Sequence, residues 1–211
     1  MKIDKGQVNL LKGYNMLLYF SGSIILNKPT DECITDFWSA GRLTQLPVSS
    51  SNPRFLLAAS LFRESCSDKV LCRKKLSEDY FRLFDTKGLL LAPPYKSRFI
   101  DDTMKTAENV SEFYDIYQWK SGIRGTAPDD HLGIELLFLT YLIDRYLQLD
   151  DDPCIREMRK EIRRFIKDHI LSWMPLWNDS VQEHSGSYCY KGIGNLIYAC
   201  VEDIDKTLSD Q

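Results

Sequence analysis

The sequence predicts an all-α protein, a single-domain helical bundle of about eight to ten helices over residues 1–211. Apolar residues recur at three- and four-residue steps through most of the chain, which is the spacing of one helix face. No segment alternates apolar and polar residues convincingly enough for a strand, and the connections between helical segments are mostly short. We therefore expect a bundle rather than an α/β fold.

Length and composition suit one globular domain. A chain of 211 residues can bury a stable core without disulfides or a metal. Its residues are 44% hydrophobic, 12% aromatic and 27% charged, which excludes a disordered or fibrous protein. The formal net charge of -3 lowers the expectation of a nucleic-acid partner, because no overall positive field gathers phosphates.

Cysteine spacing and hydropathy indicate a cytoplasmic protein. The cysteines contain no CxxC pair, so we expect reduced, buried thiols rather than a zinc or redox motif; they are Cys33, Cys66, Cys72, Cys154, Cys189 and Cys200. Asp4 and Lys12 interrupt the N-terminal apolar stretch, which does not resemble a signal peptide. The longest apolar run, 132–143, is shorter than the roughly 20 residues that cross a bilayer, so we expect no stable membrane insertion.

The first half of the chain divides into four expected helices. The first carries its apolar stripe from Val8 to Ile25 and ends at Lys28-Pro29-Thr30. A second begins at Asp31 and turns Ile34, Phe37 and Trp38 inward, with Thr30 as its cap. Asn52-Pro53 starts a third, because proline fits the first helical position. A fourth covers about 68–84.

The second half contains an irregular segment and further helices. Gly88, Pro93 and Pro94 break the helical pattern over residues 87–99. Helices then follow at about 102–119, 129–149, 152–170, 176–184 and 188–208. The helix at 129–149 is apolar on nearly every side, so we expect it at the centre of the bundle. Asp152-Pro153 is the expected start of the next one.

The strongest candidate site is Pro128-Asp129-Asp130-His131, at the expected start of the central helix. Free amides and the helix dipole concentrate positive potential there, so simple capping by the aspartates is the competing interpretation. His131 adds a group that capping does not require. A metal at His131 is not favoured, because His169 and His184 lie far away in the sequence and no HExxH-like frame occurs.

The irregular segment offers a second candidate. Its prolines hold the backbone extended, so Tyr95 and Phe99 can be presented as fixed apolar contacts for a peptide. The alternative is a loop whose aromatic side chains fold back onto the core. A catalytic site is not indicated, because the sequence has no G-x-S-x-G elbow or glycine-rich phosphate loop. We interpret His169 as a polar residue near a helix C-terminus, where partial positive charge is favourable.

Four motifs in this order resemble the TorD/DmsD/NarJ family of molybdoenzyme-maturation chaperones. They are Tyr80-x-x-Leu83-Phe84, Pro93-Pro94-Tyr95-x-Ser97-x-Phe99, Pro128-Asp129-Asp130-His131 with Glu135-Leu136, and His169-x-x-x-Trp173-x-Pro175. The resemblance implies a TorD-like all-α bundle that is not an enzyme. It also implies a partner, the twin-arginine signal peptide or N-terminus of a molybdopterin oxidoreductase catalytic subunit, whose export is delayed until the cofactor is inserted.

The resemblance further implies a signal-peptide surface. Its residues would be Tyr80, Phe84, Pro94, Tyr95, Phe99, Asp130 and His131. No resident cofactor is implied, only a weak association with GTP or molybdenum cofactor, and nucleotide binding or hydrolysis by a helical enzyme is the alternative function. The oligomeric state would be monomer or homodimer.

Two features depart from the family pattern. Ala127 occupies a position where the family often has glutamate, which removes one carboxylate from the arginine-facing set. Lys96 and Arg98 bring positive charge beside the expected groove. Arginine recognition should therefore be weaker here or depend on Asp129 and Asp130.

Overall fold

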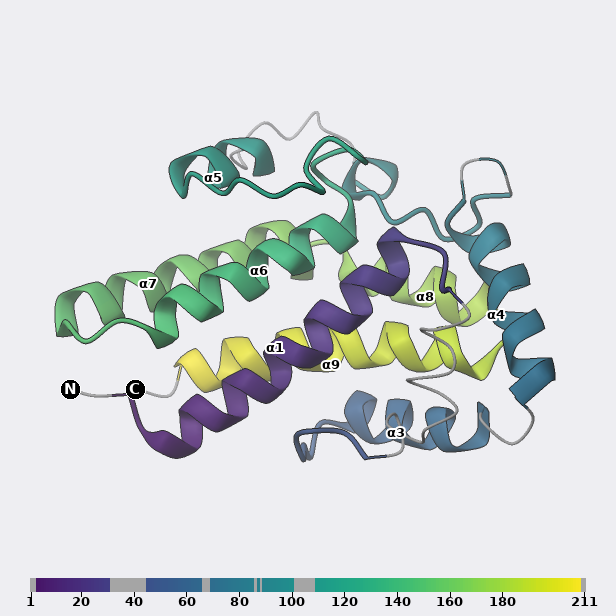
Figure 1. Cartoon of the computed structure of the whole chain (residues 1–211), viewed down its shortest axis with the longest axis horizontal. Coiled ribbons are helices and arrows are strands. Elements are labelled where there is room, and N and C mark those ends of the chain that lie inside the picture. The colour runs from purple at the N-terminus through teal and green to yellow at the C-terminus, as the bar shows by residue number, and fades with distance from the viewer. Residues whose placement is uncertain are drawn as a thin grey trace.

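The computed structural model describes residues 3–30, 45–65, 69–85, 87, 89–100 and 109–209, with the backbone alone for 69–73. These residues form α-helices (Figure 1): α1 (Lys5–Leu26), α3 (Pro53–Ser65), α4 (Lys69–Leu83), α5 (Val110–Ile116), α6 (Leu132–Leu147), α7 (Asp152–Phe165), α8 (Met174–His184) and α9 (Tyr188–Ser209). A 3-10 turn, η3 (Lys96–Arg98), and a π turn, η4 (Ile166–Leu171), complete the helical elements. Within the described ranges the extended backbone forms isolated bridges and no strand, so the all-α prediction is confirmed.

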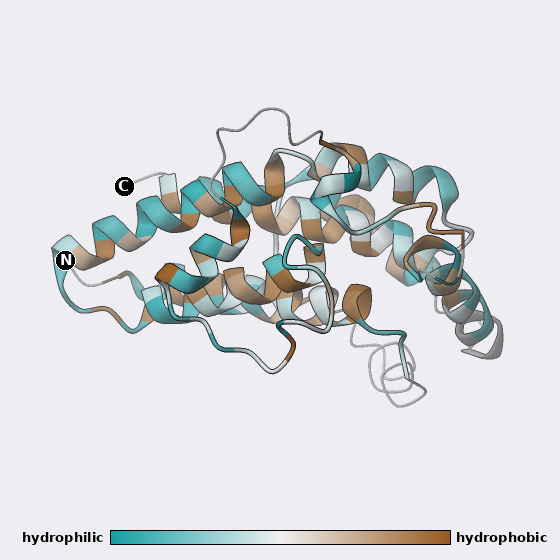
Figure 2. Ribbon diagram, turned by 90° about the horizontal axis from the view of Figure 1, so that it is seen from above, coloured by the Kyte–Doolittle hydropathy of each residue, from teal (hydrophilic) through white to brown (hydrophobic). Residues whose placement is uncertain are grey.

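Helix α9 lies at the centre of the bundle, against α3, α1 and α8, while α6 packs between α1 and α7 (Figure 1). Figure 2 shows hydrophobic and hydrophilic residues interleaved along the same helices, as expected when one face of each helix turns inward. The beginning of α1 and the end of α9 are joined by the Gln7 side-chain amide, which donates to the Thr207 carbonyl at 3.2 Å. The large fully buried side chains include Trp173, Trp177, Tyr114, Tyr146 and Tyr190.

Side-chain caps explain where several helices begin. A cap side chain accepts hydrogen bonds from backbone amides that have no partner inside the helix. The Asp4 carboxylate accepts from the amides of Gly6 and Gln7 at 2.8 and 3.2 Å. Asn52 accepts from Arg54 at 3.0 Å, which confirms the predicted Asn52-Pro53 start.

Most predicted helices are present, with shifts at their ends. The helix expected at 102–119 ends at Ile116, because Gln118 adopts a left-handed φ of 50°. The cap of α7 is Asp151 rather than Asp152, and regular α-helix stops at Phe165 instead of about residue 170. The expected second helix, with Ile34, Phe37 and Trp38, lies outside the described residues, as do 101–108.

The cysteine prediction holds in part. Cys189 and Cys200 are buried thiols, as expected, whereas Cys154 is exposed. Cys154 lies in the first turn of α7, a strongly amphipathic helix whose inward face is made instead by residues such as Ile155 and Ile162. No helix among the described residues is long and apolar enough to cross a membrane.

Helices α1 and α6 cross at a glycine pair. A Cβ atom at Gly133 would lie 2.8 Å from the Gly22 carbonyl oxygen, and one at Gly22 would lie 3.1 Å from the Gly133 carbonyl oxygen. Only glycine allows the two backbones to approach this closely. The crossing fixes the start of α6 against the last turns of α1.

We expect Gly133→Ala to destabilise the fold by about 1–3 kcal/mol, because the added methyl meets backbone that cannot move aside. Urea unfolding followed by circular dichroism measures the change. Gly122→Ala is the matched control, since a Cβ there meets no heavy atom within 4 Å. Equal unfolding midpoints for the two variants would show that the crossing tolerates a side chain.

Candidate functional site

The candidate site forms where the irregular loop meets the start of α6. The Leu132 amide donates to the Pro94 carbonyl at 2.8 Å, and the Lys96 amide donates to the Asp130 carbonyl at 3.2 Å. These bonds make a short antiparallel pairing of Tyr95 with His131. The structure thus brings together the loop and the helix start that sequence analysis singled out separately.

His131 is the N-cap of α6. Its Nδ1 accepts a hydrogen bond from the Gly133 amide at 2.9 Å, so the proton of the neutral ring is on Nε2. The ring is buried and lies edge-on to Tyr95, with centroids 5.2 Å apart. Burial lowers the pKa of His131 to about 4, against an opposing effect of Asp130. His131 is therefore an uncharged structural group at neutral pH.

The two aspartates before His131 do not cap the helix, so the competing interpretation of this motif is wrong: α6 begins only at Leu132, and His131 caps it. Asp129 accepts from the Ser111 hydroxyl at 2.7 Å and pairs with Arg124 at 3.5 Å. Asp130 accepts from the Ser97 amide at 3.0 Å. Within the described part of the chain no lysine or arginine forms an ion pair with Asp130, so its partly exposed carboxylate retains the capacity to bind a cation.

Tyr80 and Phe84 lie one turn apart on α4 and its C-terminal end but have different surroundings. Phe84 is buried, stacked on Trp177 at 6.2 Å and edge-on to Tyr190 at 5.2 Å. Tyr80 is half-buried, and its hydroxyl donates to the Leu26 carbonyl at 3.3 Å. Phe84 therefore packs edge-on against the Tyr80 ring and has no exposed surface of its own.

Tyr95 and Phe99 are partly exposed, whereas Pro94 is buried. Phe99 stacks on Trp173 with centroids 5.7 Å apart, as in the alternative in which the loop aromatics fold back onto the core. Tyr95 instead lies near acidic groups: burial raises its pKa, and the carboxylates of Asp130 and Asp85 raise it further. The predicted surface is thus reduced to Tyr80, Tyr95, Phe99 and Asp130, with the other predicted residues beneath it.

Asp85 is a site residue that sequence analysis missed. Burial is the main cause that raises the pKa of Tyr80 to about 12, and Asp85 and Tyr95 raise it further. These side chains therefore lie within electrostatic range of Tyr80. Asp85 comes directly after Phe84, the last residue of the first motif. This position is the feature of the sequence that could have indicated it. A second carboxylate, that of Asp85, therefore lies within electrostatic range of the two tyrosines, although Ala127 supplies none.

The loop that carries Tyr95 is also bonded to the π turn η4. The Lys96 ammonium donates to the Asp168 carbonyl at 2.7 Å, and the Trp173 indole donates to the His169 carbonyl at 2.6 Å. A π turn widens the helix and leaves carbonyls available for such contacts. Lys96 thus anchors the loop to η4, while its ammonium keeps its positive charge.

His169 does not carry the positive charge expected near a helix C-terminus. It is buried and stacked on Phe165 at 5.1 Å. Burial, with Lys96 and Arg164 nearby, lowers the pKa of His169 to about 4. The imidazole is therefore neutral at pH 7.

Glu135 lies one turn after His131 and is completely buried. Neither carboxyl oxygen has a hydrogen-bond partner among the described residues. Burial raises the pKa of Glu135 well above its ordinary range, although Lys96 opposes the shift. Glu135 is thus a buried carboxylic acid behind the loop. The described residues contain no group of three or more His, Cys, Asp or Glu that could hold a metal.

Residues 53–179 match the family described as the nitrate reductase delta subunit. The chain belongs to this family. All the candidate residues lie within the matched range, from Tyr80 to His131, whereas α1 and α9 lie outside it.

Relatives of this chain include proteins named chaperone protein TorD. The protein from Psychrobacter sp. (strain PRwf-1) is 28% identical over 141 residues, covering 64% of this chain and 63% of the relative. The one from Actinobacillus pleuropneumoniae serotype 3 is 29% identical over 128 residues, or 59% of each chain. In Vibrio vulnificus the identity is 28% over 143 residues, covering 65% of this chain and 66% of the relative. The match thus spans about three-fifths of the length of the first two relatives.

We expect stability to fall with acidification partly through His131. Its pKa is lowered from 6.5 to about 4 by folding, so the unfolded chain binds more protons between these values and stability drops as pH falls through them. The full effect is up to about 3 kcal/mol. His131→Asn keeps a capping side chain without the titration. The wild type should therefore lose more stability than H131N between pH 7 and 4 in urea titrations, while parallel curves would contradict the burial argument.

Glu135→Gln should stabilise the protein, and this gain in stability should grow as the pH rises. Because folding raises the pKa of Glu135, the wild type loses stability as pH rises above the ordinary pKa of a glutamate. Each pH unit in that interval costs the wild type about 1.4 kcal/mol relative to the glutamine variant. Chemical unfolding at pH 5 and pH 8 tests this, and a gain that does not grow with pH would show that Glu135 ionises freely.

Proposed function

We propose that this protein is a cytoplasmic chaperone for a molybdopterin oxidoreductase. It would bind the twin-arginine signal peptide or N-terminus of the catalytic subunit and delay export until the cofactor is inserted. Membership of the nitrate reductase delta subunit family and relatives named TorD chaperones support a maturation role. The observation that carries the binding proposal is the partly exposed group of Tyr80, Tyr95 and Phe99, with the Asp130 carboxylate fixed beside the Tyr95–His131 pairing by the Ser97 amide. Asp85 lies within electrostatic range of both tyrosines.

The chemistry of this surface suits a peptide that joins arginines to apolar residues. A guanidinium can form charge-assisted, bidentate hydrogen bonds with a carboxylate, and the carboxylate of Asp130 has a fixed position because one oxygen accepts from the Ser97 amide. Tyrosine faces attract the same cation through their π electrons. The exposed edge of Phe99 offers apolar contact next to them.

Binding is favoured over catalysis by the state of the histidines. His131 uses Nδ1 to cap α6, and both His131 and His169 are buried with lowered pKa values. A general base needs access to its substrate. These rings instead support the backbone that carries Asp130 and the loop.

Asp130→Asn should weaken binding of a peptide with Arg-Arg before an apolar stretch by about tenfold or more, because a charge-assisted bond becomes neutral. Asparagine can still accept from the Ser97 amide, so the loop keeps its position. Isothermal titration calorimetry at low salt measures the affinity.

Two comparisons sharpen this test. Asp85→Asn should also weaken binding, whereas Glu157→Gln, which alters an exposed carboxylate on α7, should not. The proposal fails if wild-type protein binds the Arg-Arg peptide no better than the same peptide with Gln-Gln.

A further inference from the structure

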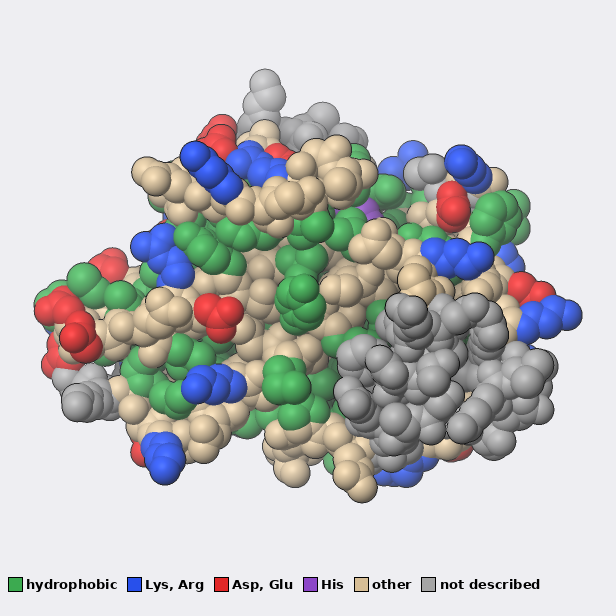
Figure 3. All heavy atoms as spheres, viewed as in Figure 1, with side chains coloured by type: hydrophobic (Ala, Val, Ile, Leu, Met, Phe, Trp, Pro, Cys, Tyr) green, Lys and Arg blue, Asp and Glu red, His purple; other side chains and the backbone are tan. Residues whose placement is uncertain are grey.

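Arg124 is bound by two carboxylates next to the candidate site. Its guanidinium pairs with Asp115 at 2.7 Å and with Asp129 at 3.5 Å. It also lies over the ring of the buried Tyr114, 5.4 Å from the ring centroid. Figure 3 shows basic and acidic side chains gathered over α5, the helix that carries Asp115 and Tyr114. A guanidinium of the chain itself therefore lies between carboxylates and an aromatic face.

These contacts have the same chemistry as those proposed for a client arginine. A guanidinium binds a carboxylate through charge-assisted hydrogen bonds and an aromatic ring through its π electrons. Asp129 and Tyr114 provide both contacts to Arg124, whereas no basic side chain of the described residues pairs with Asp130. The two carboxylates belong to consecutive residues, whose Cα atoms are about 3.8 Å apart. They are therefore spaced for two consecutive arginines, but only that of Asp130 is open to a client.

Asp129 is held in place by α5 as well as by Arg124. Its carboxylate accepts from the Ser111 hydroxyl at 2.7 Å, and its backbone carbonyl accepts from the Tyr114 hydroxyl at 2.9 Å. Its side chain is 24% exposed. Loss of the Arg124 guanidinium would therefore leave an ordered, partly exposed carboxylate without its cation. Such a preorganised group binds a charged ligand at a lower entropic cost than a flexible one.

The turn that carries Arg124 is fixed by its backbone. The Arg124 amide donates to the Ser121 carbonyl at 3.1 Å. The Thr126 amide donates to the Ile123 carbonyl at 3.1 Å. Gly125 has a left-handed φ of 90°, a conformation that glycine adopts without strain. None of these features uses the Arg124 side chain, so a variant at this position can keep the turn.

We propose that Arg124 is a specificity-determining residue, which occupies Asp129 so that the surface recognises one client arginine, through Asp130, instead of two. The inference rests on the proposed function and deepens it, because it states how many arginines of the client are recognised. A second client arginine would have to displace Arg124 from Asp129. Since that exchange replaces one partly exposed ion pair with an equivalent one, it adds little affinity. The carboxylate missing at Ala127 would then not be replaced by Asp129.

Peptides that differ in one arginine test the inference on the wild type. Four acetylated peptides carry the same apolar stretch after Arg-Arg, Arg-Gln, Gln-Arg or Gln-Gln, and isothermal titration calorimetry at low salt measures their affinities. The wild type should lose affinity at only one of the two positions, so one single-arginine peptide should bind within about twofold of Arg-Arg. A loss of about fivefold or more at each position would overturn the inference.

Arg124→Gln should open the second position. It removes the charge that occupies Asp129, so the affinity for Arg-Arg should rise about fivefold relative to that for the single-arginine peptides. Adding Asp129→Asn should abolish this gain, because the freed carboxylate is then lost. Arg124→Lys should restore the wild-type pattern, because it keeps the positive charge. A merely structural role of Arg124 predicts neither the gain nor its dependence on Asp129.

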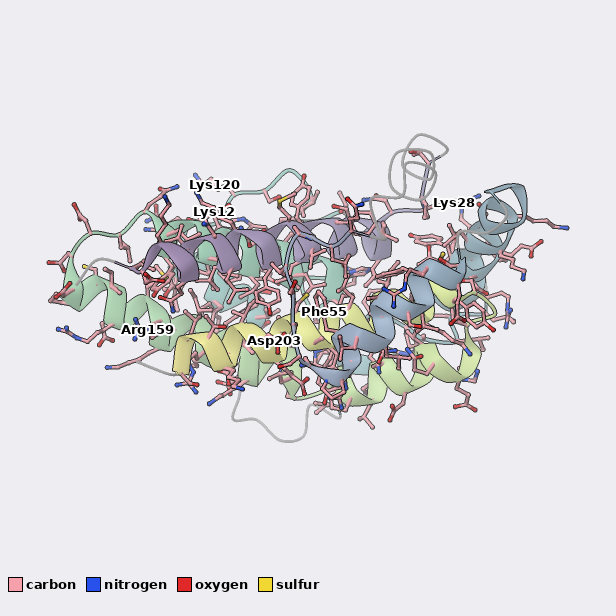
Figure 4. The ribbon with its side chains drawn as sticks, turned by 90° about the horizontal axis from the view of Figure 1, so that it is seen from below. Lys12, Lys28, Phe55, Lys120, Arg159 and Asp203 are labelled. Atoms are coloured by element: carbon pink, nitrogen blue, oxygen red, sulfur yellow. The ribbon has the colours of Figure 1, made fainter. Side chains whose placement is uncertain are left out.

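Lys120→Gln is the control for net charge. It removes a positive charge from the same segment, at an exposed side chain that lies at the edge of the molecule (Figure 4). If it raises the affinity for Arg-Arg as much as Arg124→Gln does, the effect comes from net charge and the inference is wrong. Circular dichroism and the urea unfolding midpoint show whether Arg124→Gln is folded, and the wild-type measurement decides if it is not.

The outcomes separate this inference from the proposed function. If folded Arg124→Gln does not strengthen binding of Arg-Arg while Asp130→Asn weakens it, the inference is overturned and the proposed function stands. If the wild type binds Arg-Arg no better than Gln-Gln, the proposed function fails and the inference fails with it.

Discussion

The buried start of α6 imposes the constraint on which the rest of the site depends. Amides in the first turn of a helix have no partner inside it, and burial removes water as a substitute. The Gly133 amide is satisfied by His131 Nδ1 and the Leu132 amide by the Pro94 carbonyl. Meeting this requirement pins the loop to α6, and the pinned loop in turn holds Asp130 through Ser97.

The helical architecture was predictable because apolar periodicity and proline positions are local properties of the sequence. The Asn52-Pro53 start and the span of α9 followed from such signals. The start of α6 did not, because two aspartates before an apolar run look like a first turn. Whether Asp129 turns to Ser111 and Arg124 depends on residues that folding brings near.

The sequence predicted which segments form the candidate site but not which of their side chains are exposed. The family resemblance implied that the loop and the segment at Asp130-His131 share one surface, yet exposure is decided by packing. Phe84 is covered by Trp177 and Tyr190 from distant helices, so the sequence alone could not show that it is buried. Likewise, Asp85 comes within electrostatic range of Tyr95 only because folding brings the end of α4 near the loop. Lys96 donates to the Asp168 carbonyl, which lies 72 residues further along the chain and comes within reach only through folding.

The π turn also has a consequence for how this chain can vary. A π turn holds one residue more than regular α-helix would at the same place. Deleting one residue from Ile166–Leu171 would let the segment close into regular α-helix, with the helix beyond it near its present register. Trp173 and Trp177 would then keep their stacking on Phe99 and Phe84, whereas the carbonyls of the segment, including the Asp168 carbonyl that accepts from Lys96, would shift. The length of this segment, as much as its residue types, is therefore a condition for keeping the loop in place.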